Sequence, residues 1–218
     1  MPATPLNTNA ARLSVLAAEC EGAGNLKLTE RFDRALLLAS ELHRSQIRKG
    51  TEIPYMAHLM AVSALVLENG GTEDEAIAGL LHDAVEDQGG AATLSRIRDA
   101  FGDDVAEIVA AASDTDQTPK PPWHHRKEQY LLHLESASVP VLRVSAADKL
   151  HNARSLLVDF RVVGDGLWER FSAPVAEQLW YYRSLVDVFQ RRLGGTLSSE
   201  LSRTVDELRL LASPQHSE

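Results

Sequence analysis

The pair His82-Asp83, followed by Glu86-Asp87, has the residue types and spacing in this chain that best fit chemistry. Residues four apart on a helix stack on one face, which would place each residue of the second pair below one residue of the first. One imidazole and three carboxylates on a single ridge repel unless a cation lies among them or they reach water. The spacing therefore predicts a metal centre with acidic residues beside it, and with it a hydrolytic reaction.

Two further metal ligands are expected from distant parts of the chain. His58 begins an apolar segment, and Asp148 follows a run of small residues that would let a metal ion approach the backbone. Nitrogen and oxygen donors together suit borderline or hard divalent ions such as Mn²⁺, Zn²⁺ or Fe²⁺. The predicted four-ligand set is His58, His82, Asp83 and Asp148.

Two other clusters combine basic and polar side chains. In the first, Arg44 and Arg48 are four apart, so both guanidinium groups would point at one ligand if this segment is helical. The alternative is a solvated helix end, where cations favour the helix dipole. The second cluster is a polar stripe at helical spacing, formed by Asp148, His151, Asn152 and Ser155. Such a stripe fits a wet cavity best, with a structural hydrogen-bond network as the alternative.

These residues fall into four blocks, which are His43-Arg44-x-Gln46-x-Arg48-Lys49, Pro54-Tyr55-x-x-His58, Leu81-His82-Asp83-x-x-Glu86-Asp87 and Asp148-Lys149-Leu150-His151-Asn152-x-Arg154. In order and spacing, over about residues 28–195, they resemble the hydrolase domain of the Rel/SpoT alarmone enzymes. A complete Rel/SpoT enzyme continues into a synthetase domain and regulatory modules. The resemblance therefore implies a stand-alone small alarmone hydrolase with an HD-type helical bundle.

The resemblance also implies an activity and a role for each matching residue. The expected enzyme is a Mn²⁺-dependent 3′-pyrophosphohydrolase of ppGpp and pppGpp, with the four ligands named above. Glu86 and Asp87 would orient and deprotonate the attacking water. The expected substrate-binding residues, on the purine, ribose and phosphate sides, are Arg44, Arg48, Lys49, Lys149, Asn152 and Ser155.

Two departures from the family pattern leave the nucleotide preference open. Leu59 stands where the family usually has proline, and Lys149 stands where arginine is common in enzymes with a synthetase domain. Related small hydrolases act on adenosine alarmones or on NADPH, so these are alternative substrates. Competing interpretations of the motifs are a general HD-type phosphohydrolase, a catalytically silent alarmone-binding or antitoxin-like module, and a helical scaffold with a chance His-Asp pair.

The elements that must position these residues are nearly all helical. Apolar residues recur at helical spacing in predicted helices at 10–20, 31–47, 55–68, 73–86, 93–101, 103–112, 123–136, 139–159, 166–171, 173–193 and 198–212. The prediction is a single all-α domain of about ten helices. Its expected parts are an N-terminal leader with a short helix at 1–25, the hydrolase domain at 26–195, and a C-terminal helix and tail at 196–218.

The amino-acid composition and the net charge restrict the class of protein to which this chain can belong. The 218 residues are 44% hydrophobic and 24% charged, which is ordinary for a soluble globular domain. A net charge of −9 argues against nucleic acid as a partner and leaves a small phosphorylated ligand open. Cys20 is the single cysteine, and no apolar run or secretory signal is evident, so we expect a cytoplasmic protein with no membrane partner. The run Trp180-Tyr181-Tyr182 is interpreted as core, with a homo-oligomer face as the alternative.

Overall fold

The computed structural model describes residues 27–113 and 121–212. Within these ranges the chain is helical, and its only β-structure is an isolated antiparallel bridge between Ile47 and Pro54. The helices are α2 (Glu30–Leu42), α3 (Met56–Glu68), α4 (Glu73–Leu81), α5 (Ala84–Asp87), α6 (Gly90–Phe101), α7 (Asp103–Ala112), α8 (Trp123–Ser136), α9 (Val139–Val163), the 3₁₀ helix η1 (Gly164–Arg170), α10 (Val175–Arg192) and α11 (Gly195–Ala212). This confirms the predicted all-α fold of about ten helices.

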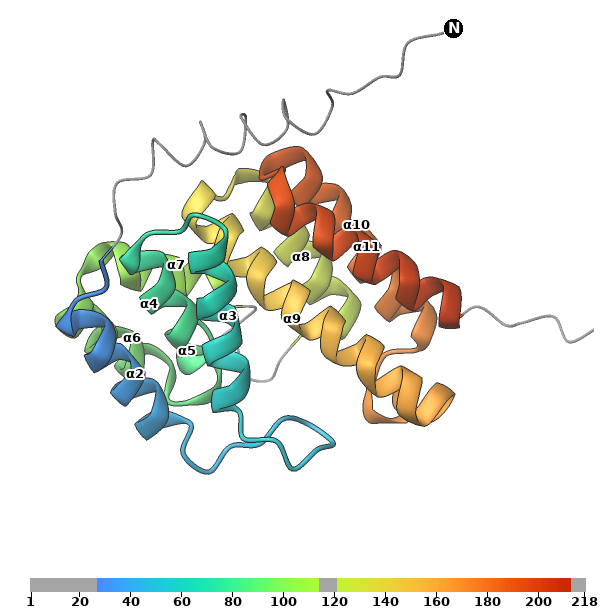
Figure 1. Cartoon of the computed structure of the whole chain (residues 1–218), viewed down its shortest axis with the longest axis horizontal. Helices are drawn as coiled ribbons and strands as arrows, with labels where there is room; N and C mark the ends of the chain where they lie inside the picture. Colours follow the sequence, from blue (N-terminus) through green and yellow to red (C-terminus); the bar gives the residue numbers. More distant parts are fainter. Residues whose placement is uncertain (1–26, 114–120, 213–218) are drawn as a thin grey trace, which may run out of the picture.

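Helix α9 is the central element of the molecule (Figure 1). It contacts α3, α4, α7, α10, α11 and η1. Its first four turns are buried on almost every side, as is typical of a helix enclosed by other helices. The small residues Ser145, Ala146 and Ala147 are buried there immediately before Asp148, so neighbouring helices approach the backbone closely at that point.

Helices α2 and α4 begin at sequence signals that are satisfied in the structure. Thr29 caps α2 by accepting a hydrogen bond from the backbone N–H of Arg31. Thr72 and Glu75 form a capping box at the start of α4. The buried Glu75 carboxylate also pairs with Arg143 of α9. This ion pair ties α4 to α9, the two helices that carry or lead into parts of the predicted metal site.

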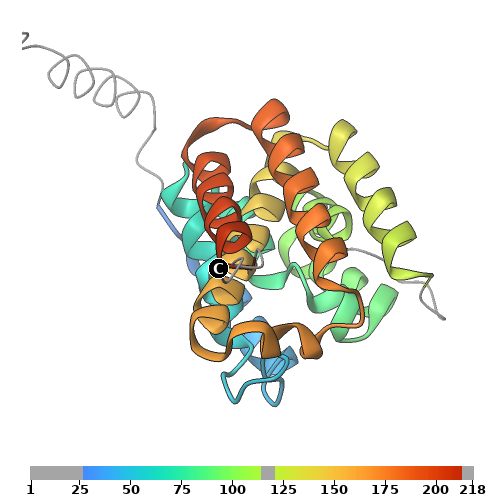
Figure 2. The ribbon, with the colours of Figure 1, turned by 90° about the vertical axis from the view of Figure 1, so that its right-hand side faces the viewer.

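The C-terminal helices α10 and α11 both pack against α9. Helix α10 lies between α8 and α11 (Figure 2). Helix α11 runs alongside α9, and the two are joined by ion pairs Arg154–Glu200 and Arg161–Glu207. Tyr181 and Tyr182 are buried in the core, as predicted, and Trp180 is partly buried against it.

Two predicted helices end earlier than their periodicity indicated. The segment predicted as one helix over 73–86 ends at Leu81, and a short helix starts again at Ala84 after a two-residue turn. Asp83 has φ −95° and ψ −3°, so the predicted continuous helix through His82 and Glu86 is wrong. Asp87 nevertheless lies one turn after Asp83, because its backbone N–H donates to the carbonyl of Asp83 at 2.9 Å. The other predicted helices lie close to observed ones, except that the helix predicted at 10–20 lies outside the described residues. The last residues of the predicted tail also lie outside them.

The second shortened helix is α2, which ends at Leu42 and not at residue 47. The chain instead enters a hairpin-like loop, residues 43–55, closed by hydrogen bonds from Arg48 N to Ile53 O and from Tyr55 N to Gln46 O, both of 2.8 Å. Arg44 and Arg48 are therefore not on a common helix face, and the geometric argument that paired them is wrong. The loop is still a defined structure because its two sides are bonded to each other.

Candidate metal centre

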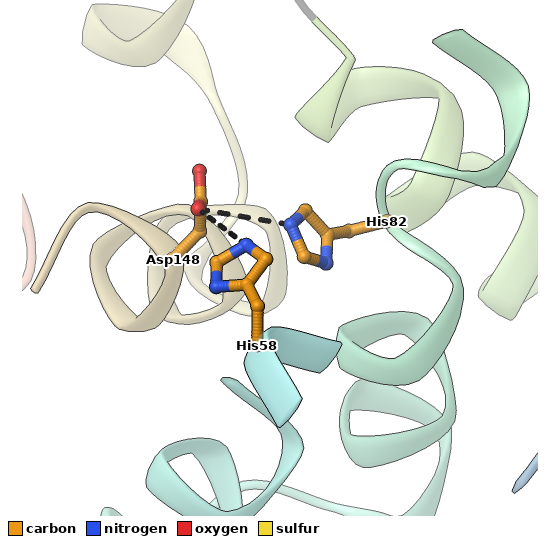
Figure 3. A group of neighbouring side chains, drawn as sticks. All are labelled: His58, His82 and Asp148. Carbon is orange, nitrogen blue, oxygen red and sulfur yellow. Dashed lines mark ion pairs between the residues drawn. The ribbon is translucent and has the colours of Figure 1, made fainter. Parts of the chain in front are cut away.

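Three buried side chains from three separate elements meet at one point (Figure 3). His58 is in the first turn of α3, His82 is in the turn after α4, and Asp148 is in the middle of α9. One potential ligand atom from each residue lies within 4.8 Å of the other two. These three predicted ligands therefore form a metal-binding group.

Asp83, the fourth predicted ligand, lies against the same group. Its Oδ2 atom is 2.9 Å from His82 Nε2 and 3.6 Å from His58 Nε2. Asp148 Oδ1 is 3.2 Å from His58 Nε2 and 3.7 Å from His82 Nε2. Donor atoms about 2.1 Å from a common ion are about 3.0–3.4 Å apart in octahedral or tetrahedral geometry. The observed spacings are close to those that one divalent ion requires.

The orientation of His82 also fits a metal ligand. Its Nδ1 donates a hydrogen bond to the carbonyl of Gly79 at 2.8 Å, which fixes the proton on that nitrogen when the ring is neutral. The other nitrogen, Nε2, is buried and makes no hydrogen bond to any described residue, although carboxylate oxygens lie near it. When the ring is neutral, Nε2 has a lone pair that faces two carboxylates, and these atoms together match the donor set of a divalent cation.

His58 is oriented by a second histidine. Its Nδ1 lies 2.8 Å from Nδ1 of His151, one turn after Asp148 on α9. Burial, followed by the neighbouring His58 and Arg48, lowers the pKa of His151 to about 4, so this ring is neutral and can accept a hydrogen bond at one nitrogen. When Nδ1 of His58 donates to it, Nε2 of His58 is free to face the metal-binding group.

Neighbouring side chains hold the two carboxylates in place. Lys149 Nζ lies 2.7 Å from Asp148 Oδ2, and the Asn152 amide donates to Asp148 Oδ1. The hydroxyl of Tyr55 donates to Asp83 Oδ2 at 2.6 Å. Burial, followed by the Asp83 carboxylate, raises the pKa of Tyr55, which keeps this phenol protonated as a donor. Both carboxylates thus present a fixed face to the imidazoles.

The electrostatics of the group favour a positive ion. Burial opposes charge on His82, yet the adjacent Asp83 carboxylate raises the pKa of this imidazole well above its usual value. Burial likewise opposes charge on Asp148, but Lys149 and then the histidines hold the pKa of this carboxyl well below its usual range. The two ionised carboxylates thus draw positive charge to the point where they face the imidazoles, and a divalent cation supplies it.

A cavity of about 660 Å³ opens beside this group. Its lining includes Tyr55, Lys149, His151 and Asn152, each of which contacts one of the predicted metal ligands. Its six cationic lining residues are Arg48, Lys49, Lys127, Lys149, Arg154 and Arg170, and among the described residues the single acidic one is Asp159. This volume is that of a small-molecule site, and its charge selects an anion.

Five of the six predicted substrate-binding residues line the cavity, namely Arg48, Lys49, Lys149, Asn152 and Ser155. Arg48, in the loop at 43–55, donates a hydrogen bond of 2.8 Å to Oδ1 of Asn152 in α9. Arg44 is exposed and is not part of this lining. Glu86 is half-buried, whereas Asp87 is exposed and accepts a hydrogen bond of 2.8 Å from the Gln46 amide.

Several lining residues had no predicted role. Trp123 and Lys127 come from α8, and Lys127 lies over the Trp123 ring. Their spacing of four residues, which places both on one face of a helix, was the available signal. Arg170 and Phe171 follow α9, and no local pattern marks them. Tyr55 was part of a quoted block, but its bond to Asp83 joins residues far apart in the sequence.

Comparisons with known proteins agree with this geometry. Residues 35–163 match the HD domain family. The chain is 38% identical over 132 residues to the guanosine-3′,5′-bis(diphosphate) 3′-pyrophosphohydrolase MESH1 of Xenopus tropicalis, covering 57% of this chain and 71% of that protein. It is 31% identical over 133 residues to the bifunctional (p)ppGpp synthase/hydrolase SpoT of Escherichia coli K12, covering 58% of this chain but 18% of that longer protein.

Solved structures show the same fold. A metazoan ortholog of SpoT, described as hydrolysing ppGpp, superposes with a TM-score of 0.65 at 24% identity, over 87% of this chain and 99% of that one. The protein lmo0812 of Listeria monocytogenes superposes with a TM-score of 0.60 at 28% identity, over 72% of this chain and 99% of that one. The chain therefore belongs to the HD domain family and is homologous to MESH1 and SpoT.

Proposed function

We propose that this protein is a Mn²⁺-dependent 3′-pyrophosphohydrolase that converts ppGpp and pppGpp to GDP and GTP with release of pyrophosphate. One observation carries the proposal. A buried His/Asp metal group opens onto a cavity lined by six cations, in a chain whose net charge is −9. The activity named for the relatives MESH1 and SpoT supports the same reaction.

His58, His82 and Asp148, with Asp83 beside them, are the residues that would hold the ion. When bound, a divalent ion polarises phosphoryl oxygens and lowers the pKa of water, which is a poor nucleophile at neutral pH. Mn²⁺ is the ion we propose because the resemblance to the Rel/SpoT hydrolases implies it, and carboxylate donors are compatible with it. The neighbours Tyr55, Asn152 and Lys149 keep the carboxylates in place while substrate enters and leaves.

Glu86 and Asp87 are the proposed proton acceptors for the attacking water. They follow the metal-binding turn directly, and a positioned general base contributes about 10²–10⁴-fold to rate. Water adds to the phosphorus joined to the ribose 3′-oxygen, and the bond between that phosphorus and the 3′-oxygen breaks. The 3′-oxygen takes up a proton and pyrophosphate leaves.

The cations of the cavity are the proposed binding residues for the charged groups of the nucleotide. Lys149 is next to Asp148 and therefore lies at the metal end, whereas Lys49 lies over the Phe171 ring, with 5.8 Å between its Nζ and the ring centroid. A ligand with phosphate groups at two ends would meet positive charge at both. Because such nucleotides occur in the cytoplasm, we also propose a cytoplasmic location.

The test is pyrophosphate release from ppGpp by metal-free protein and by protein supplied with Mn²⁺, Zn²⁺ or Mg²⁺. We expect turnover of ppGpp with Mn²⁺ and none in the chelated protein. ppApp and NADPH, tested in parallel, define the base and substrate class. Tight binding of ppGpp without product in any metal form would indicate a sensing module and contradict the proposal.

A further inference from the structure

His43 and Gln46 lie next to Asp87, one of the two predicted water-activating residues. They belong to neither the metal group nor the cavity lining. His43 is 2% exposed, and its Nδ1 lies 2.7 Å from Gln46 Oε1. The amide nitrogen of Gln46 donates to Asp87 Oδ2 at 2.8 Å. A continuous path of two hydrogen bonds therefore runs from a buried imidazole to the Asp87 carboxylate.

The direction of this path is fixed by chemistry. An ionised carboxylate only accepts, so the NH₂ group of Gln46 must face Asp87 and its carbonyl must face His43. Gln88 also donates to this carbonyl, at 2.6 Å. His43 must then carry its proton on Nδ1. Every donor in the path points toward Asp87, and the bonds strengthen one another in sequence.

The opposite nitrogen of His43 indicates that the ring serves this path. Nε2 is buried and has no hydrogen-bond partner among the described residues. An unpaired buried nitrogen costs stability, and a phenylalanine would fill the same space without that cost. Packing alone therefore does not account for an imidazole here, whereas donation to Gln46 does.

The same ring is connected to the metal group by stacking. His43 and Tyr55 are 5.4 Å apart between ring centroids and 19° from parallel, and Tyr55 donates to Asp83. The backbones of Gln46 and Tyr55 are hydrogen-bonded across the loop at 43–55. The loop at 43–55 thus carries two side chains that donate to carboxylates, Gln46 to Asp87 and Tyr55 to Asp83. His43 contacts both Gln46 and Tyr55.

We propose that His43 and Gln46 are positioning residues, which hold the Asp87 carboxylate in register with the metal group through this directed hydrogen-bond path. The inference rests on the proposed function, because it concerns the orientation of a carboxylate that accepts a proton from water. A misplacement of about 1 Å in a catalytic group can cost on the order of 10²-fold in rate.

Three variants separate the parts of the path. Gln46→Met removes the donor to Asp87 at similar side-chain length. His43→Phe keeps a ring against Tyr55 but removes the donor to Gln46. His43→Asn restores a donor near the position of Nδ1 without the ring. Ser45→Ala, in the same exposed turn, is the matched control.

In Mn²⁺-loaded protein, we expect Gln46→Met and His43→Phe to lower kcat on ppGpp about 10- to 100-fold with little change in KM. His43→Asn should recover most of kcat, and Ser45→Ala should match the unmodified protein. The pH profile gives a second signature. Partial desolvation and the carboxylates of Asp83 and Glu86 raise the pKa of Asp87, and the Gln46 N–H and the nearby His43 oppose that rise. Loss of the Gln46 N–H should therefore move the acid limb of kcat to higher pH.

A readout without substrate separates this inference from the proposed function. We expect the Asp87 carboxyl, followed by ¹³C NMR in Zn²⁺-loaded protein, to titrate at higher pH in Gln46→Met than in the unmodified protein or Ser45→Ala. Unchanged kcat and unchanged titration in Gln46→Met would overturn the positioning role even if the protein hydrolyses ppGpp. Absence of turnover in the unmodified protein, with the expected NMR shift, would refute the proposed function and leave the hydrogen-bond path supported.

Discussion

Asp148 uses its two carboxylate oxygens for different purposes. Oδ1 faces the two imidazoles and accepts from the Asn152 amide, while Oδ2 pairs with Lys149. A buried carboxylate is costly unless it is paired and hydrogen-bonded, and here the lysine meets that need at Oδ2 and the amide at Oδ1. Oδ1 also faces both imidazoles, where a cation would bind. Asp148 is therefore placed to act as a ligand in the proposed site and to anchor α9.

Replacement of Asp148 and of Glu86 should separate metal binding from turnover. In Asp148→Asn we expect metal affinity to fall by more than about 100-fold, because even the outer partners of metal ligands cost 10–100-fold when they are lost. In Glu86→Gln we expect full metal content and a kcat lower by about 10²–10⁴-fold, the range for loss of a general base. Metal content by mass spectrometry and pyrophosphate release are the two measurements.

The exposed Asp187→Asn on α10 is the matched control, since it removes a carboxylate far along the chain from the site. It should leave both quantities unchanged. If Asp148→Asn keeps its metal and its activity, the assignment of this residue as a ligand is wrong. If Glu86→Gln loses its metal, then Glu86 is a ligand and not the proton acceptor.

Residue types and spacing singled out the residues that meet in the metal-binding group, because imidazoles and carboxylates are unusual in an apolar context. The stripe through Asn152 and Ser155 was also predicted to face a cavity, and both residues line it. Gln46 and Tyr55 could not be assigned in the same way. Their partners are 41 and 28 residues away, so only the tertiary fold reveals what their polar atoms contact.

At the scale of elements, the site depends on how closely α3 and α4 pack. Gly79 of α4 lies against the backbone of Ser63 in α3, and a Cβ built on this glycine would be 3.1 Å from Ser63 Cα. The carbonyl of Gly79 also accepts from His82. His58 begins α3 and His82 follows α4, so the separation of these helices sets the separation of two ligands.

We therefore predict that Gly79→Ala weakens both the fold and the metal site. Overpacking against a rigid backbone costs about 1–3 kcal/mol, and the better helix propensity of alanine offsets about 1 kcal/mol. The net effect is a loss of up to about 2 kcal/mol in the free energy of unfolding. A ligand shift of a few tenths of an ångström should also lower metal affinity. Chemical denaturation and metal titration measure the two effects.

Gly166→Ala is the control, because a Cβ at Gly166 meets no atom within 4 Å. It should be neutral or slightly stabilising, as expected for an unstrained glycine replacement. Equal stability and equal metal affinity in the two alanine variants would show that the close approach of α3 and α4 is not required.

The interruption after α4 shows where periodicity stops being informative. His82 has φ −59° and ψ −32°, and Asp83 stays in the right-handed region, so apolar spacing continues through a turn that is no longer a regular helix. At the end of α2, the buried His43 extends the apolar pattern past the last helical residue. In both places, contacts with other elements determine the backbone conformation, and the local sequence pattern does not contain these contacts.

At the scale of the whole molecule, the charge distribution is uneven. The chain carries a net charge of −9, yet the cavity gathers cations from the loop at 43–55, from α8 and α9, and from η1. At physiological salt, charges more than about 8 Å away are largely screened. A ligand inside the cavity therefore experiences the cations and the metal group more than the acidic surface.

Because the cavity joins several elements, a bound nucleotide should stabilise the entire fold. In Mn²⁺-loaded Glu86→Gln, which is expected to bind without turnover, ppGpp at 100 times its dissociation constant should add about 2.7 kcal/mol to the free energy of unfolding. For a chain of this size, that corresponds to a rise in Tm of about 5–10 °C. GDP lacks the 3′-pyrophosphate, so at the same concentration it should give a smaller rise.

Thermal unfolding followed by circular dichroism measures this stabilisation. Adding Lys149→Ala to Glu86→Gln should reduce the rise with ppGpp more than the rise with GDP, because Lys149 lies beside Asp148 at the metal end of the cavity. Chelation of the metal should reduce the rise with ppGpp as well. Equal shifts for ppGpp and GDP would mean that the 3′-pyrophosphate is not held at the metal end, and would place the scissile bond outside the site that the ligands and the cavity define.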